Sequence, residues 1–137
     1  MILGETLQEH GKKVLEEIME AGADCAEKLG ATPEDMDLLM KKQVPSNKAG
    51  QCVVACVNKK FGLQKEDGTI NKGYKMANME AVKAIDEDVY NKMTSIWNDC
   101  GENVVQASDE CDTGLNLVKC MKESGEKLGL TKEVMGF

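Results

Sequence analysis

The chain has 137 residues, of which 42% are hydrophobic and 30% charged, and a formal net charge of −7; this size fits one domain with a single core. All 17 basic residues are lysines, so the arginine forks that read phosphate and guanine are missing, and binding to nucleic acid or anionic membranes is disfavoured. No apolar run approaches the ~20 residues that cross a bilayer, which argues against membrane insertion.

Helical periodicity begins near the N-terminus. In the first segment, apolar and small residues recur every three or four positions between Glu and Lys: Leu7, Gly11, Val14, Leu15, Ile18, Gly22 and Cys25. A second helix is expected after Thr32, which can serve as its N-cap, with Pro33 at the first helical position and acidic residues in the first turn. Pro45 disfavours helix at the preceding residue and ends this element.

The third predicted helix carries two cysteines one turn apart. Ser46 or Asn47 can cap it, Cys52 and Cys56 lie on one of its faces, and it ends near Gly62. The polar, glycine-bearing stretch QKEDGTINKG then predicts a turn region.

Helix is predicted again in the second half of the chain. A fourth helix runs through residues 74–82, and a fifth runs through 86–100, where Gly101 either ends or interrupts it. The triplet SDE at 108–110 caps a sixth helix. Because no strand alternation or repeat is visible, we predict one all-α domain over residues 1–137, a compact bundle of six to seven short helices.

Six cysteines form an even set: Cys25, Cys52, Cys56, Cys100, Cys111 and Cys120. A zinc site would need more close cysteine pairs and nearby histidines, whereas the single histidine, His10, is far from them in sequence. We therefore expect a disulfide framework with no metal and no cofactor. Disulfides imply an oxidising compartment and hence secretion; because the first ten residues do not resemble a signal peptide, we expect that a leader has been removed.

Helix geometry restricts how these cysteines pair. Cys111 and Cys120 lie nine apart on one helix, about 13 Å at 1.5 Å per residue, which is too far for a bond. Cys52 and Cys56 point the same way from their helix, which disfavours a bond between them. Ten of the 15 connectivities that six cysteines allow remain open, and all of them tie the third helix to two other parts of the chain.

The cysteine spacing, C-x26-C-x3-C-x43-C-x10-C-x8-C, resembles that of the six-cysteine insect odorant-binding proteins, the pheromone- and general-odorant-binding family. The three- and eight-residue gaps are the most fixed intervals of that family and both match, whereas the 43-residue gap lies at its long end. The resemblance implies three interlocked bridges, Cys25–Cys56, Cys52–Cys111 and Cys100–Cys120, around an apolar cavity.

The resemblance also implies a function. Members of the family are secreted carriers that bind small hydrophobic molecules, such as odorants and pheromones, and transport them through aqueous fluid to receptors. The bridges can offset the core energy lost to a cavity, so the physics agrees with such a role. We also predict a chemosensory receptor as a partner and a weak homodimer.

Candidate ligand-binding residues come from two sources. Offsets from the cysteines carry pocket positions of the family to Ile18, Val54, Asn58, Trp97, Val118 and Met121, with Asn58 as a polar hook for an alcohol, aldehyde or carbonyl. Apolar helix faces and the adaptability of methionine add Met40, Met76, Met79, Met93 and Leu115. The alternative is ordinary core packing for the apolar residues and a solvent-facing position for Asn58.

Residues 123–137 are expected to form a C-terminal tail. In relatives with tails of this length the C-terminus folds over the pocket, so we expect Leu128, Leu130, Val134 and Phe137 to form a lid, with Phe137 at the opening. A frayed terminus is the alternative. With one histidine in the chain, a pH switch based on a histidine cluster is not expected.

Two other classes of protein are weaker candidates. An enzyme is disfavoured because the chain holds no nucleophile elbow or metal-binding helix motif that would give His10 a catalytic role. A secreted helical interaction or scavenger protein, which binds other small ligands or a protein partner, is the main alternative. Saturable, displaceable binding of a hydrophobic probe that changes Trp97 emission would distinguish a carrier from it.

Overall fold

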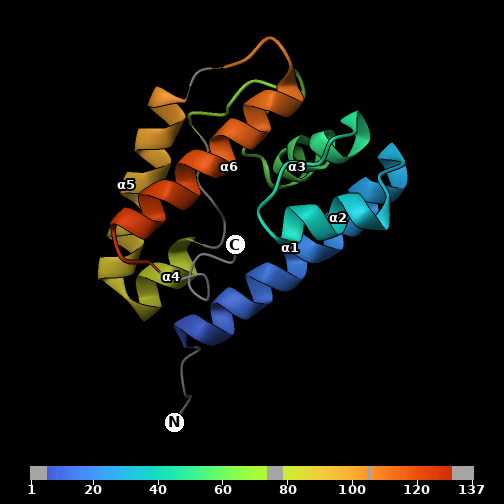
Figure 1. The fold of residues 1–137 in the computed structure, drawn as a ribbon. Coiled ribbons are helices and arrows are strands. Elements are labelled where there is room, and N and C mark those ends of the chain that lie inside the picture. Colours follow the sequence, from blue (N-terminus) through green and yellow to red (C-terminus); the bar gives the residue numbers. More distant parts are fainter. Residues whose placement is uncertain (1–5, 74–78, 105, 131–137) are drawn as a thin grey trace.

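The computed structural model describes residues 6–73, 79–104 and 106–130. These ranges contain six helices and no strand (Figure 1). The helices are α1 (Leu7–Leu29), α2 (Pro33–Met40), α3 (Lys48–Phe61), α4 (Met79–Ile85), α5 (Glu87–Asn103) and α6 (Glu110–Lys127). The predicted all-α bundle is therefore confirmed, although α1, with 23 residues, is a long helix rather than a short one.

Local chemistry explains where the helices begin and end. Thr6 and Thr32 each start a helix with a capping box, in which the threonine hydroxyl accepts the N3 amide and the N3 carboxylate accepts the amide of the cap. Asn47 rather than Ser46 caps α3, because its side-chain oxygen accepts the amide of the third helical residue. Gly62 ends α3 at a φ of 84°, where a Cβ would be strained.

Two helix ends differ from the prediction. Gly101 lies inside α5 and neither ends nor interrupts it, which is consistent with the modest cost of about 1 kcal/mol for glycine in a helix. Helix α6 extends through residues 123–127, so these residues belong to the helix and not to a separate tail. The predicted start of the fourth helix, residues 74–78, lies outside the described part of the chain.

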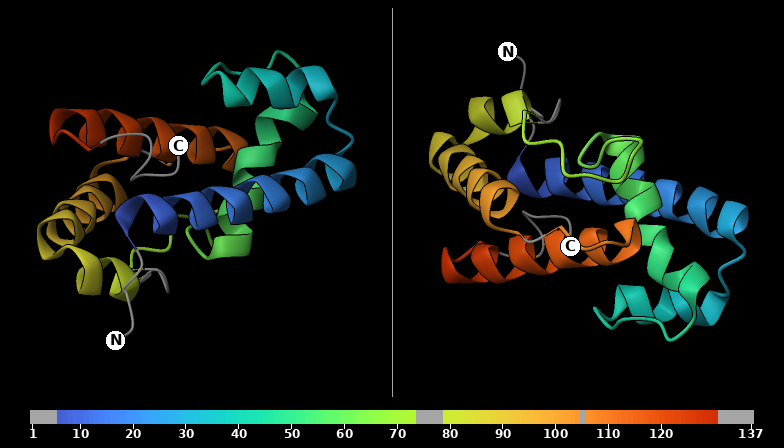
Figure 2. Two further views of the ribbon diagram at one scale, coloured as in Figure 1. Left: turned by 90° about the horizontal axis from the view of Figure 1, so that it is seen from below. Right: turned by 90° about the horizontal axis from the view of Figure 1, so that it is seen from above.

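Helices α1 and α6 form the two long sides of the bundle. At one end α5 contacts both α4 and α6, and at the other end α3 contacts α1, α2 and α6, as the views in Figure 2 show. The two long helices are therefore held apart at both ends by other helices.

Three disulfides connect this frame as the family resemblance implied. They are Cys25–Cys56, Cys52–Cys111 and Cys100–Cys120, with S–S distances of 2.04–2.05 Å. The first joins α1 to α3, the second α3 to α6, and the third α5 to α6. Helix α3 is thus tied in two directions, as the two cysteines one turn apart predicted.

Most of the buried apolar residues form two clusters. The first cluster joins α5 and α6 to the loop after α3, with Leu63, Ile70, Ile96, Trp97, Cys100, Leu117 and Met121. The second joins α1 to α3 and comprises Cys25, Ala26 and Val53, with Met36 and Leu39 of α2 packed against it.

Candidate ligand-binding site

The first candidate, Ile18, lies at the centre of the buried face of α1. Gly11, Gly22 and Cys25, at helical spacings from it, are all buried. Ile18 itself is only partly buried. An apolar side chain in the middle of a buried face usually has the best-covered position of its helix, and the partial exposure of Ile18 departs from this pattern.

Met93 occupies the equivalent position on α5. It lies one turn after Val89 and one turn before Trp97, and both of these neighbours are buried. Met93 again keeps part of its surface accessible. Helices α1 and α5 therefore show the same pattern.

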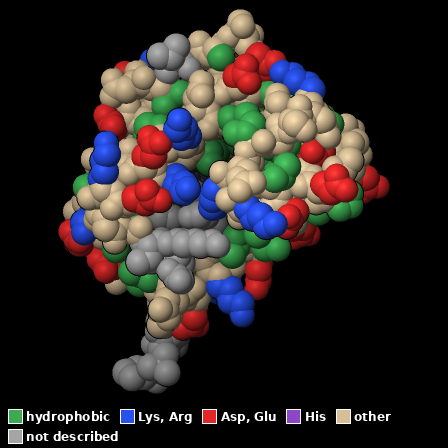
Figure 3. Space-filling view, in the orientation of Figure 1, with side chains coloured by type: hydrophobic (Ala, Val, Ile, Leu, Met, Phe, Trp, Pro, Cys, Tyr) green, Lys and Arg blue, Asp and Glu red, His purple; other side chains and the backbone are tan. Residues whose placement is uncertain are grey.

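Helices α3 and α6 contribute the next group of candidates. Val54 lies between the buried residues Gly50 and Asn58 of α3 but is itself partly buried. On α6, Leu115 and Val118 follow Cys111 at helical spacing and are also partly buried, with Val118 packed against the first cluster. Figure 3 shows apolar side chains in a recessed part of the surface between α6 and α3, with lysines beside it.

Trp97 and Met121 are more completely enclosed. Each keeps 8% of its surface exposed within the first cluster. They contact the same core, so a guest that reaches this cluster would touch the single tryptophan of the chain.

Asn58 is neither solvent-facing nor an open hook. It is 3% exposed, and its side-chain nitrogen donates a hydrogen bond of 2.8 Å to Gln64 Oε1. The predicted alternative of a solvent-facing asparagine is therefore wrong, and one of the two amide hydrogens is already committed to another side chain.

The methionine candidates differ in how far they are buried. Met79 begins α4 and is partly buried, whereas Met40 is 49% exposed. Short α2 packs inward through Met36 and Leu39, which turns Met40 outward at the end of the helix. Met76 and Phe137 lie outside the described residues.

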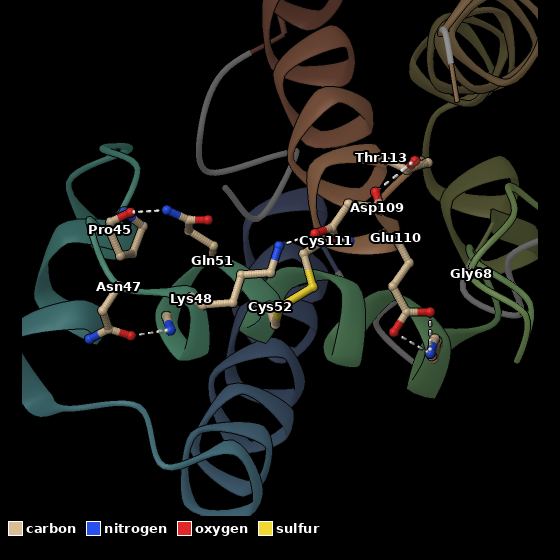
Figure 4. Close-up of a disulfide and its surroundings, with 12 residues drawn as sticks. Pro45, Asn47, Lys48, Gln51, Cys52, Gly68, Asp109, Glu110, Cys111 and Thr113 are labelled. Atoms are coloured by element: carbon tan, nitrogen blue, oxygen red, sulfur yellow. Dashed lines mark hydrogen bonds and ion pairs between the residues drawn. A yellow bond between two sulfur atoms is a disulfide. The ribbon is translucent and has the colours of Figure 1, made fainter. Parts of the chain in front are cut away.

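The ion pairs at the junction of α3 with the start of α6 were not predicted. Lys48 pairs with Asp109 and Lys59 with Glu110, on either side of the Cys52–Cys111 disulfide (Figure 4). The Lys48 ammonium, together with the backbone amide of Cys111, lowers the pKa of Asp109 below its ordinary value of 3.8.

Gln64 completes this junction from the turn region. It is 2% exposed, and its side-chain nitrogen donates to the carbonyl oxygens of Gly68 and Glu110 at 2.8 and 3.1 Å. A glutamine in a polar, glycine-bearing stretch carries no local sign of burial, so the sequence offered nothing that would single it out.

No described helix is both long and apolar enough to span a bilayer. Within the same described ranges, no group of three or more His, Cys, Asp or Glu side chains is arranged to hold a metal ion.

These features define a class: a small helical binding protein whose frame is stapled by three interlocked disulfides. Comparison with known protein families gives one clear assignment. The model of the PBP/GOBP family matches residues 8–124. The chain therefore belongs to the PBP/GOBP family.

Individual relatives agree with this assignment. General odorant-binding protein 19d of Drosophila melanogaster is 27% identical over 83% of this chain and 75% of its own length, and general odorant-binding protein 28a of the same insect is 27% identical over 87% and 82%. The solved structure of odorant-binding protein dmelOBP28a from Drosophila melanogaster superposes with a TM-score of 0.70 and 27% identity, covering 88% of this chain and 99% of that one. The function supported by family, relatives and fold together is that of a small-ligand odorant carrier, and the family consists of carriers rather than enzymes.

Proposed function

We propose that this carrier holds its hydrophobic ligand in the middle of the frame, between the two core clusters, and delivers it through extracellular fluid to a chemosensory receptor. The observation that carries this proposal is the incomplete burial of Ile18 and Met93 at the centres of inward helix faces. Side chains in such positions are normally close-packed, so accessible surface there favours a space that a guest can fill.

The proposed wall combines residues from five helices. It comprises Ile18, Val54, Met79, Met93, Leu115 and Val118, with Trp97 and Met121 at the end formed by the first cluster. Met76 and Phe137 remain predicted members, whereas Met40 is left out because of its exposure.

Secretion is the second part of the proposal. Three disulfides persist only in an oxidising compartment, and a carrier of odorants works in extracellular fluid. We infer that the mature chain acts outside the cell after removal of a leader. A weak homodimer remains a prediction, with the sedimentation coefficient at increasing protein concentration as its measurement.

The C-terminal residues are proposed as a lid over the ligand. Leu130, the last described residue, packs against the first cluster, so the chain leaves α6 along the apolar core. Deleting residues 131–137 should weaken ligand binding and speed its release. Equal affinities for the full and shortened chains, at both neutral and mildly acidic pH, would contradict the lid.

A space-filling substitution tests the site itself. Ile18→Phe should leave the free energy of unfolding nearly unchanged if there is room for the ring, while it lowers the affinity for a fluorescent hydrophobic probe. In a solid core the same substitution would cost about 1–3 kcal/mol. Met19→Phe is the matched control, because Met19 is 50% exposed on the same helix and its replacement should alter neither quantity.

The carrier proposal would be contradicted by a loss of stability without a change in binding. Saturable probe binding that quenches or shifts the emission of Trp97, and that a competing hydrophobic compound reverses, is the supporting result.

A further inference from the structure

Lys122 continues the proposed ligand-facing stripe of α6. It lies one turn after Val118 and two turns after Leu115, so the three side chains project from nearly the same face of the helix. Lys122 is partly buried, whereas Lys119 and Lys127 of the same helix are exposed. The stripe therefore runs from apolar residues into a single sheltered cation.

The direction of the side chain supports this placement. Helical side chains lean towards the N-terminus of their helix, so the stem of Lys122 is expected to lie over the turn that carries Val118. Lysine stems commonly cover apolar surface while the charged head stays accessible. The head group is thus available at the margin of the proposed site.

Among the described residues, no carboxylate forms an ion pair with this ammonium. Lys41 and Lys92 each pair with an aspartate four residues earlier, at 2.8 and 3.1 Å. The residue four before Lys122 is Val118, and none of the ion pairs between described residues includes Lys122. An accessible acid four residues later, Glu126, is exposed and forms no ion pair with it.

We propose that Lys122 anchors the ionised head of the ligand, so that this carrier prefers amphiphiles with a carboxylate at one end of an aliphatic body. The inference rests on the proposed ligand site and names the chemical class of its occupant. Lys122 would also supply the polar contact to the ligand that was predicted for Asn58, whose side-chain nitrogen is bonded to Gln64 instead. A charge-assisted contact to a carboxylate is stronger than a neutral hydrogen bond, and an ester of the same body cannot make it.

A matched ligand pair tests this preference. Dissociation constants for decanoic acid and its methyl ester would be measured by displacement of a fluorescent probe from the oxidised full chain near neutral pH. The natural chain should bind the acid about tenfold more tightly than the ester, the size expected of one charge-assisted contact at a partly buried site. In K122Q that ratio should fall to about one, with the affinity for the ester changed less than about twofold.

Two further variants separate charge from position. K122R keeps the cation and should keep the preference for the acid, whereas K119Q removes an exposed lysine of the same helix and should change neither affinity. An unchanged acid-to-ester ratio in K122Q, or an equal loss in K119Q, would overturn the role of Lys122. Failure of the natural chain to bind the probe and both ligands would instead overturn the proposed ligand site.

Discussion

Asn58 of α3 and Gln64 of the following loop share a hydrogen bond of 2.8 Å inside the protein, although both are polar and neither lies in a predicted core position. Gln64 uses its nitrogen to hold the carbonyl oxygens of Gly68 and Glu110. One side chain therefore joins α3, the turn region and the start of α6. Buried amides of this kind stabilise a fold only while all their partners are satisfied.

Replacing Gln64 tests this network. Gln64→Leu keeps an apolar stem but leaves the partners of three hydrogen bonds unsatisfied, so the free energy of unfolding should fall by about 3 kcal/mol. Gln43→Leu is the control, because Gln43 is exposed and its replacement should cost under about 0.5 kcal/mol. Equal stabilities in urea titrations of the two variants would show that the network contributes nothing particular.

The crossing of α3 over α6 depends on Gly114. A Cβ at this position would lie 2.7 Å from Gln64 Oε1 and 3.2 Å from backbone atoms of Ala55, so Gly114→Ala should destabilise the fold by about 2 kcal/mol. Gly22→Ala is the matched change in α1, where a Cβ would meet only Met36 Cε at 3.5 Å. Gly22→Ala should stabilise the chain by up to about 1 kcal/mol, and thermal unfolding of both variants measures the difference in sign.

The disulfides should differ in their contribution because they close loops of different length. Cys52–Cys111 spans 59 residues and Cys100–Cys120 spans 20. On the chain-entropy model, replacing each pair by alanines should lower the free energy of unfolding by about 4 and about 3 kcal/mol, respectively. Guanidinium titrations of the two double variants give the comparison, and the reverse order would contradict a mainly entropic role.

Acid should weaken the ion pair between Lys48 and Asp109. Because the pKa of Asp109 is lowered in the folded state, mainly by Lys48 and next by the Cys111 amide, its stabilisation is present above the ordinary value of 3.8 and is lost as pH falls through the folded value. A double-mutant cycle of Asp109→Asn and Lys48→Met should show coupling at pH 7 that is lost as the pH falls below the ordinary value of 3.8. Coupling that persists in acid would exclude this pair as its source.

Asp35 should behave in the same way at the junction of α2 and α3. The backbone amide of Thr32 lowers its pKa first, with further help from the side chains of Asn47 and Thr32. Its contribution is therefore also present at neutral pH and lost only in strong acid. Asp35→Asn should lower stability at pH 7 and converge with the natural chain only as the pH falls below the ordinary value of 3.8, which acid titration of the circular dichroism signal follows.

Local signals explain most of what could be predicted about the fold. The caps at Thr32 and Asn47, the turn between α3 and α4 and the acidic start of α5 depend on contacts within a few residues, so their chemistry is visible in the chain itself. The cysteine pairing was different, because helix geometry left ten arrangements and only the resemblance to a family chose among them.

The sequence by itself determined an all-helical chain, its helix starts and the two directions in which α3 is tied, since these follow from the order of neighbouring residues. Only the tertiary structure decided that Met40 points outward, that Asn58 is buried against Gln64, and that Lys122 is partly buried without an ion pair to another described residue. Burial and charge pairing depend on which distant helices cover a side chain, and the spacing of residues along one helix does not contain that information.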